Sequence, residues 1–394
     1  MIPLFFKEKT MIQRNGYSIL GYGCMRLPSD DKLAEKLIMK AYNSGINYFD
    51  TAYVYKGKEE QLGKILAKNN IREKVTVATK LPVYMIRKRE QFDEFFDEEL
   101  KRLQTDYVDN YLMHMLPDET TWKRLVDLGI IEWLEKKKEL GQIKRVGFSF
   151  HGSTDIFLRL LDAYDWEFCM VQYNYLDENS QAGRKGVETA ASKGIPVFIM
   201  EPLRGGRLTK GLNKKAQAVI AKTDKTAGEW GLSWLYNQET ITCVLSGMET
   251  MEVLEENLRI VDNFKTFDEA DYKVIEKIKD AINSKKHIPC TGCKYCMPCP
   301  FGVDIPGAFR CYNTSYNDGF IRGETEYVMS IAMKEEQGLV SQCKQCGKCE
   351  KVCPQQIPIR KEIKKVKRRL QPPFFRIIRR ISDHYYKTGN KTIE

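Results

Sequence analysis

Eight short apolar runs, separated by amphipathic stretches, constrain the fold of this chain more than any other feature of its sequence. The runs occupy residues 19–25, 47–52, 75–80, 108–114, 145–150, 168–174, 196–201 and 241–247. Between them, stretches such as 31–45, 90–104 and 130–142 repeat apolar side chains at helical spacing. Strands that are apolar almost throughout and alternate with helices indicate a parallel sheet covered by helices.

Eight such units within residues 1–282 predict an α/β fold in which the strands close into a (β/α)8 TIM barrel. A doubly wound open sheet is the alternative. That fold carries a Gly-x-Gly-x-x-Gly fingerprint after its first strand, and this chain lacks one in that context. We therefore assign residues 1–282 to a barrel.

The composition supports a folded protein without membrane spans. Of its 394 residues, 42% are hydrophobic and 11% aromatic, which allows a large core and excludes global disorder. No run approaches the roughly 18 apolar residues of a spanning helix. The opening segment MIPLFFKEKT has neither the basic region nor the cleavage site of a secretory signal. We expect a cytoplasmic protein whose thiols are reduced.

Titratable side chains of several kinds follow the predicted strands. In a (β/α)8 barrel the carboxyl ends of the strands face the active site. The residues at or just beyond these ends are Asp50, Tyr55, Lys80, His114, Ser149, Gln172 and Asn174. The sequence therefore predicts that four titratable groups, one each of Asp, Tyr, Lys and His, converge on one mouth of the barrel.

This set of four predicts a general acid. A tyrosine has an ordinary pKa of about 10 and becomes a useful acid when a neighbour stabilises its phenolate. Lys80 would provide that stabilisation, Asp50 would hold Lys80 in place, and His114 would donate a hydrogen bond to the substrate oxygen. Such a site protonates the alkoxide that forms when a hydride reduces a carbonyl. Taken singly, each residue also has an ordinary structural explanation, such as a core histidine or a strand-end lysine.

The same segments resemble the aldo-keto reductase family. FDTAYVY carries the family's Asp and Tyr at Asp50 and Tyr55, VATK carries its Lys at Lys80, and YLMH carries its His at His114. The resemblance implies an oxidoreductase that reduces a small carbonyl-type substrate with a nicotinamide cofactor.

The resemblance also implies where the nicotinamide cofactor binds. The implied contacts are Ser149, Gln172, Met200, Leu203, Gly205, Gly206, Glu256 and Asn257. Met200 stands where many relatives place an aromatic ring, and the family's Ser-Asn pair is only half kept as Ser149–Phe150. Glu249 and Glu252 occupy the region that usually grips the 2′-phosphate of NADP, so the choice between NADP and NAD stays open.

Nine of the twelve cysteines fall between residues 290 and 353, and eight of these form two runs that each end in Cys-Pro. The runs are Cys290, Cys293, Cys296 and Cys299, then Cys343, Cys346, Cys349 and Cys353. The second run has the spacing with which bacterial ferredoxins hold a [4Fe–4S] cluster. Zinc held by paired Cys-x2-Cys motifs is the alternative, but zinc does not require the additional cysteines and prolines. We predict two [4Fe–4S] clusters in a small, mainly helical domain spanning residues 283–360.

The predicted ligand sets cross between the two runs. In two-cluster ferredoxins, the first three cysteines of each run bind one cluster and the Cys-Pro cysteine binds the other. Cys353 would then join the first run and Cys299 the second. Two residues rather than three precede Cys299, so Cys311 is a reserve ligand. This part resembles the helical dicluster ferredoxin module of larger reductases.

The net charge of +10 is concentrated near the C-terminus. Residues 360–380 contain ten Lys/Arg and one Glu. We treat residues 361–394 as a basic amphipathic tail that contacts an anionic membrane or an acidic partner; a solvated charge run beside a packing helix is the alternative. A basic character confined to a tail argues against nucleic-acid binding.

Three functions remain compatible with these features. The first is a carbonyl or enone reductase whose clusters relay electrons between the barrel and a ferredoxin-like donor. A flavin would then join hydride and one-electron chemistry, although no flavin fingerprint is present, or the clusters would reduce the substrate directly while Tyr55 and His114 supply protons. The second is a nicotinamide-dependent reductase with structural or sensory clusters. The third is an electron-transfer subunit with a vestigial barrel, which the intact catalytic set disfavours.

Overall fold

A computed structural model of the chain describes residues 11–284, 288–290, 292, 294–333, 337–353 and 355–372. Three features singled out in the sequence lie outside these ranges. They are the opening segment at 1–10, Cys293, and the tail from residue 373 onward.

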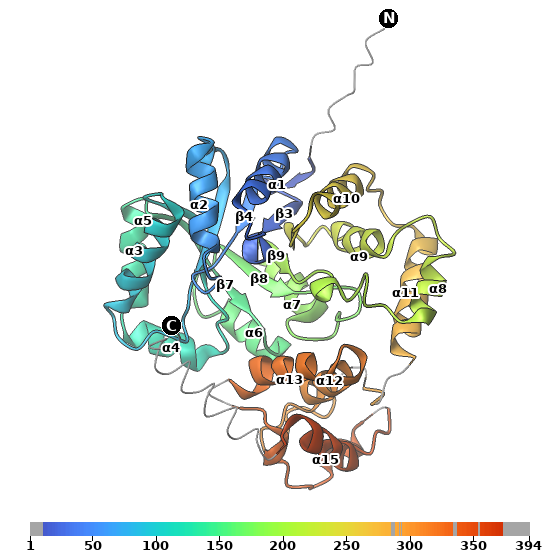
Figure 1. Cartoon of the computed structure of the whole chain (residues 1–394). Coiled ribbons are helices and arrows are strands. Elements are labelled where there is room, and N and C mark those ends of the chain that lie inside the picture. The colour runs from blue at the N-terminus through green and yellow to red at the C-terminus, as the bar shows by residue number, and fades with distance from the viewer. Residues whose placement is uncertain are drawn as a thin grey trace, which may run out of the picture.

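Eight parallel strands close into a barrel, as the sequence predicts (Figure 1). They are β3 (Leu20–Gly23), β4 (Tyr48–Asp50), β5 (Thr76–Leu81), β6 (Val108–Met113), β7 (Ile143–Phe150), β8 (Phe168–Gln172), β9 (Val197–Met200) and β10 (Cys243–Ser246). The last strand, β10, pairs with both β9 and β3. Because this pairing leaves no open edge, the doubly wound alternative is excluded.

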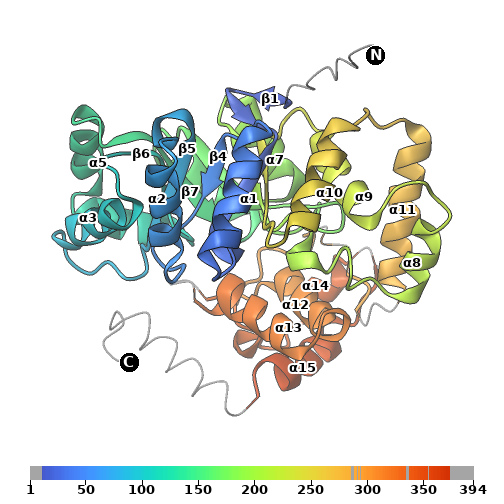
Figure 2. The same ribbon diagram turned by 45° about the horizontal axis from the view of Figure 1, so that its top comes forward.

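Helices surround the barrel and connect its strands (Figures 1 and 2). They are α1 (Asp31–Asn43), α2 (Lys58–Lys68), α3 (Gln91–Leu103), α4 (Glu119–Asp127), α5 (Ile130–Glu139), α6 (Thr154–Leu161), α7 (Gly183–Ser192), α8 (Lys214–Ile220), α9 (Ala227–Tyr236), α10 (Met251–Asp262) and α11 (Glu269–Asn283). Local sequence determines where several of them begin. Asp30, for example, accepts hydrogen bonds from the backbone N–H groups of Lys32 and Leu33 and so caps α1.

A short hairpin closes the N-terminal end of the barrel. Its strands are β1 (Gln13–Arg14) and β2 (Tyr17–Ser18), which pair antiparallel. The Tyr17 ring packs edge-on against Tyr48 and Phe198, with centroids 5.6 and 5.0 Å away. Its hydroxyl donates to Asn110 Oδ1 at 3.2 Å. The eight-run pattern did not predict this hairpin, whose strands have only two residues each.

The cysteine-rich part is helical, as predicted, and has a hydrophobic core of its own. Its helices are α12 (Ile305–Asn317), α13 (Phe320–Tyr327), α14 (Lys348–Lys351) and α15 (Ile359–Leu370), with a π-helical turn at Val328–Ala332. The buried side of α15 includes Ile363 and Val366, which belong to this core. The helix therefore runs across residue 360, where we had expected the tail to begin. We refer to the described residues from 288 to 372 as the cysteine module.

The cysteine module packs against the barrel with α12 and α13 on its inner side and α15 on its outer side (Figures 1 and 2). The barrel contributes to this contact the loop that follows β8, through Asn179, and the loop that follows β9, through Glu201 and Arg204. The module thus covers part of the C-terminal end of the strands, where the active site is expected. Among the described residues, no helix is both long and apolar enough to cross a membrane.

Candidate functional site

A buried ion pair lies at the centre of the barrel mouth. Lys80 Nζ is 2.7 Å from Asp50 Oδ1, and both side chains are more than nine-tenths buried. The strand register brings them together, because Asp50 pairs with Ala78, which points to the same side of β5 as Lys80. Burial acts to lower the pKa of Lys80, but Asp50 and Tyr55 outweigh it and the net pKa is raised. Lys80 therefore stays an ammonium ion.

Tyr55 lies against this pair, on the loop that follows β4. The Lys80 Nζ atom is 5.2 Å from the centroid of the Tyr55 ring, and the His114 ring meets it edge-on at 6.1 Å. Burial raises the pKa of Tyr55, and the opposing effect of Lys80 is smaller. We had expected Lys80 to favour the phenolate. It does so, but burial dominates, and Tyr55 keeps its proton at neutral pH.

His114 directly follows β6 and is held neutral. Burial lowers its pKa well below 6.5, and the charges of Lys80 and His151 add to the shift. Its Nδ1 atom is buried with no hydrogen-bond partner among the described residues, and the same is true of Asp50 Oδ2. The four predicted catalytic residues thus occupy one site that contains unsatisfied polar atoms; their catalytic roles stay a prediction.

Ser149 and Gln172 lie at the ends of the next two strands. Ser149 Oγ accepts a hydrogen bond from the backbone N–H of Met115 at 2.8 Å. Gln172 Nε2 donates to Asp177 Oδ2 at 2.9 Å, whereas Gln172 Oε1 is buried and has no hydrogen-bond partner within the described ranges. An amide N–H₂ group, such as that of a nicotinamide carboxamide, would satisfy this oxygen.

The backbone of the loop after β9 adopts a glycine-rich conformation that lets a ligand approach it closely. Met200 ends β9 and packs against the apolar interior of the barrel. Arg204–Gly206 forms a 3₁₀ turn in which Gly205 and Gly206 have φ angles of 67° and 90°. Glycine reaches this left-handed region without strain. Leu203 packs on Gly231 of α9, where an added Cβ would come within 2.4 Å of it.

Arg26 is a residue that our sequence reasoning missed. A Cβ added at Gly205 would lie 3.0 Å from Arg26 Nη2, and one added at Gly247 would lie 3.6 Å from Arg26 Cδ. The side chain therefore lies between the loops that follow β9 and β10. It is exposed, and no ion pair or hydrogen bond joins it to another described residue. The sequence feature that could have identified Arg26 is its position, because it is a cation directly after the first predicted strand.

Glu256 and Asn257 lie on α10, which follows β10. Glu256 is exposed and accepts a hydrogen bond from Thr226 Oγ1 at 3.1 Å. Asn257 is buried, and its Nδ2 donates to the carbonyl of Val253 at 2.7 Å. The side-chain amide of Asn257 is therefore hydrogen-bonded within its own helix. The Glu256 carboxylate is the more accessible of the two groups.

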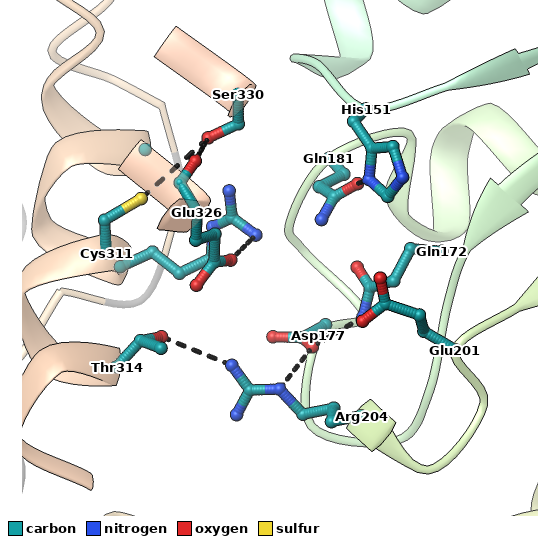
Figure 3. Close-up of polar contacts among 12 residues, drawn as sticks. His151, Gln172, Asp177, Gln181, Glu201, Arg204, Cys311, Thr314, Glu326 and Ser330 are labelled. Carbon is teal, nitrogen blue, oxygen red and sulfur yellow. Dashed lines mark hydrogen bonds and ion pairs between the residues drawn. The ribbon is translucent and has the colours of Figure 1, made fainter. Parts of the chain in front are cut away.

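A buried polar chain links Gln172 to the cysteine module (Figure 3). Asp177 Oδ2, which accepts from Gln172, is 3.3 Å from Arg204 Nε. Arg204 then reaches the module, with Nη1 at 3.4 Å from Asp318 Oδ2 and Nη2 at 3.3 Å from Thr314 Oγ1. Burial acts to raise the pKa of Asp177, but nearby arginines outweigh it and lower the pKa. Asp177 therefore stays charged.

Further charged groups face each other across the same boundary (Figure 3). Glu201 of the barrel forms an ion pair with Arg322 of the module. His151 lies nearby on the barrel side, with Nδ1 at 3.2 Å from Gln181 Oε1, and burial lowers its pKa. Sequence reasoning missed this boundary, because its partners are more than one hundred residues apart.

The cysteines line two adjacent cavities inside the module. Cys290, Cys296 and Cys353 line the first, which measures about 20 Å³. Cys296, Cys299, Cys343, Cys346 and Cys349 line the second, which measures about 300 Å³. Within the described ranges, no three potential ligands converge on a position for a single metal ion. The second cavity has room for four irons and four sulfides, and the first would have to widen to hold them.

The positions of three cysteines bear on the predicted ligand sets. Cys353 lines the first cavity and Cys299 the second, as crossed sets would require. The sets themselves stay a prediction, since Cys293 is outside the described residues. Cys311, the reserve ligand, lines neither cavity; it is buried, with Sγ 3.9 Å from Ser330 Oγ.

The first cavity is the one nearer the barrel. Gly292, between two of the first-run cysteines, has a φ of +73°, and a Cβ there would lie 3.1 Å from the carbonyl oxygen of Asn179 in the barrel. Lys294, which lines this cavity, experiences the charge of Asp155, also in the barrel. The second cavity is instead bordered by residues of the module's own surface, such as Tyr295 and Lys348.

This barrel, with its strand-end ion pair and its cysteine module, belongs to an oxidoreductase. The chain is a member of the aldo/keto reductase family, whose model matches residues 19–280, and a 4Fe-4S dicluster domain matches residues 289–358. It is 28% identical to L-galactose dehydrogenase of Arabidopsis thaliana over 302 residues, covering 68% of this chain and 92% of that protein.

Other relatives extend the comparison. The chain is 22% identical to the aldo-keto reductase yakc [NADP(+)] of Schizosaccharomyces pombe, covering 71% of this chain and 94% of that one. Among solved structures, the holo form of aldo-keto reductase AKR11C1 from Bacillus halodurans superposes with a TM-score of 0.58 at 23% identity. That comparison covers 68% of this chain and 96% of the other, and it supports the barrel fold.

Proposed function

We propose that the barrel reduces a carbonyl or a related unsaturated bond of a small molecule, and that two [4Fe–4S] clusters carry electrons between it and a redox partner. One observation carries the proposal. The Asp50–Lys80 ion pair and Tyr55 lie at one end of the barrel, and the cysteine module packs against that same end.

Each catalytic residue has a defined task in this reaction. A bound nicotinamide would supply the two electrons as a hydride, or bound clusters would supply them one at a time in its place. Tyr55 donates its proton to the substrate oxygen as that oxygen gains negative charge. Lys80 stabilises the phenolate that remains, and Asp50 holds Lys80 charged. Neutral His114 donates a hydrogen bond to the same oxygen, which stabilises the developing charge.

We infer that the cofactor is NAD(P)H and make no choice between NAD and NADP. The unpartnered Gln172 Oε1 atom suits a carboxamide. The turn that follows Leu203, with Gly205 and Gly206, suits phosphate groups, and so does Arg26, which forms no ion pair with any residue that the structure describes. Ser149, Met200, Glu256 and Asn257 complete the proposed set of contacts.

The proposed cluster ligands follow the two cavities. Cys290, Cys293, Cys296 and Cys353 would bind one cluster, and Cys299, Cys343, Cys346 and Cys349 the other. We propose that residues 283–360 contain both clusters. Two one-electron centres together match the two electrons of a hydride. A flavin between them and the nicotinamide, or direct reduction of the substrate by the clusters, would complete the route.

A second function is favoured by the buried contact of Arg204 with Asp318 and Thr314. In this version the barrel is an ordinary nicotinamide-dependent reductase, and the clusters stabilise the module that supports its loop. Cluster loss would then loosen the loop after β9 and leave the chemistry of the Tyr55 site unchanged.

Low-temperature EPR of protein purified without oxygen separates the two versions. Spectra are recorded after NADH or NADPH, and again after dithionite, alongside iron analysis. Cluster signals after the nicotinamide alone would mean that barrel and clusters exchange electrons. Signals after dithionite alone would refute that exchange and favour either a carrier protein as donor or a structural role. Protein reconstituted with iron and sulfide that shows neither signal nor bound iron would refute the clusters.

A further inference from the structure

We propose that the outer surface of the cysteine module docks a small, acidic, one-electron carrier protein over the second cavity. We call this surface the docking face. It comprises Cys346 with the apolar Tyr295, Phe301 and Val352, and the cations Lys344, Lys348, Lys351, Lys364 and Lys367. The inference rests on the proposed function, in which the second cavity holds a redox cluster.

The second cavity is close to solvent on this side. Cys346, one of its lining residues, is exposed. Tyr295 and Val352 also line it and have 69% and 48% of their surfaces exposed. Apolar side chains at the centre of a polar surface are the usual core of a protein interface. Here they lie where electrons would enter, at the cavity farther from the barrel.

Cations surround this apolar centre. Lys344, Lys348 and Lys351 come from the second cysteine run, and all three are exposed. Lys364 and Lys367 are exposed on α15, and each lies four residues after a residue that lines the cavity, Arg360 and Ile363 respectively. None of the five has an ion-pair partner among the described residues.

The acidic residues of the same segment are already neutralised. Glu350 is 2.8 Å from Arg360 Nε, and Glu362 is 2.8 Å from Lys365 Nζ. The docking face therefore presents an uncompensated positive field at the cavity. Such a field attracts an acidic partner and raises its rate of association.

Charge and packing disfavour three other occupants of the docking face, namely the C-terminal tail, a second copy of the chain and a membrane. Residues 373–394 contain five Lys/Arg and two Asp/Glu, so this tail has the same sign as the docking face. A second copy of the chain would present the same cations to it. An amphipathic helix binds a membrane through a free apolar side, and that side of α15, including Ile363, Val366 and Leu370, is buried in the module core.

The transfer itself is a single-electron step. The reduced carrier loses one electron, the cluster in the second cavity gains it, and no bond or proton changes place. The electron would then pass to a cluster held in the first cavity, which shares the lining residue Cys296 with the second and faces the barrel. The docking face thus stands at the outer end of the route, and the barrel at the inner end.

Stopped-flow reduction of the oxidised holoprotein tests the proposal. The donors are a reduced plant-type [2Fe–2S] ferredoxin, which is acidic, and reduced methyl viologen, which needs no docking. The variant K348E/K351E/K364E reverses three charges on the docking face. The matched control K36E/K136E/K277E reverses three exposed cations on the barrel. A second variant, K364E/K367E, lies on α15 alone and leaves the cysteine loop unchanged.

We expect both docking-face variants to slow reduction by ferredoxin at least tenfold at low ionic strength, and added salt to slow the parent protein similarly. The control variant and all reactions with methyl viologen should change less than twofold. Unchanged ferredoxin rates in the variants would overturn the proposal. So would charge-dependent binding to phosphatidylglycerol vesicles with unaltered ferredoxin rates. If methyl viologen also fails to reduce the protein, the proposed cluster function fails, and the docking proposal fails with it.

Discussion

Arg204 of the barrel and Asp318 of the cysteine module form an ion pair across their boundary, with 3.4 Å between Nη1 and Oδ2. Both side chains are only 11–12% exposed. Through Asp177, the same arginine is connected to Gln172 in the proposed nicotinamide site. The loop that would contact the cofactor is therefore held from both sides.

Replacing Asp318 should weaken this boundary. Asp318→Ala leaves a buried guanidinium with one carboxylate fewer, and we expect it to destabilise the module by about 2–4 kcal/mol. Urea unfolding, followed by cluster absorbance, measures this free energy. Arg322→Ala is the control, because its pair with Glu201 is about one third exposed on each side and should contribute about 0–1 kcal/mol. Equal effects of the two substitutions would contradict the prediction.

Tyr55→Phe tests the proposed proton donor. The substitution removes the hydroxyl and keeps the ring beside Lys80, so carbonyl reduction should fall by at least about 100-fold. The cluster absorbance should not change, since Tyr55 is in the barrel. Tyr53→Phe, two residues away and packed on Phe95 and Arg102, should keep full turnover. Undiminished turnover in the Tyr55 variant would refute its assignment.

Lys80→Met tests the buried ion pair. Burial already raises the pKa of Asp50, and the substitution removes the cation that opposes this, so a buried carboxyl group is left without its partner at a cost of about 3–5 kcal/mol of folding free energy. Fluorescence during urea unfolding reports on the barrel alone, because all five tryptophans lie between residues 122 and 234.

Two further variants control this measurement. The double variant D50N/K80M should recover most of the stability, because neither residue is then charged, but it should not recover activity. Lys64→Met removes a surface lysine paired with Glu60 and should change stability little. Full stability in the single Lys80 variant would show that the pair is dispensable for folding.

Cys346→Ala tests the cluster ligands. If Cys346 belongs to one of two clusters, bound iron should fall by about half while one EPR signal persists. Cys311→Ala should keep all the iron, since Cys311 lines neither cavity. Loss of all iron in the Cys346 variant would point to a single, shared metal centre.

The pH dependence of carbonyl reduction follows from the two proton-bearing groups. His114 has a pKa well below 6.5, so its imidazole is neutral above that pH. Burial raises the pKa of Tyr55 above 10.0, so its phenol is protonated below that pH. Neither group should titrate between pH 6.5 and 10, and kcat/KM should stay flat there. An inflection in this range that disappears in His114→Gln would show that His114 titrates there in the free enzyme and would contradict the prediction.

Much of the fold could be predicted because it is encoded locally. The spacing of apolar side chains revealed all eight strands, and the ends of β4, β5, β6, β7, β8 and β9 supplied predicted site residues. Contacts between distant segments had no such signal. Arg26 lies next to Gly205, and Tyr17 next to Phe198, only because the barrel closes on itself.

The sequence by itself determined the barrel, its candidate catalytic residues and the cysteine runs, because periodicity and spacing depend on neighbours along the chain. The tertiary structure alone decided which charges meet. It placed Asp318 against Arg204, turned the first cavity toward the barrel, and left the lysines around Cys346 without an ion-pair partner in the part of the chain that the structure describes. These relations depend on how two separately packed cores fit together. A one-dimensional pattern of burial does not specify that fit.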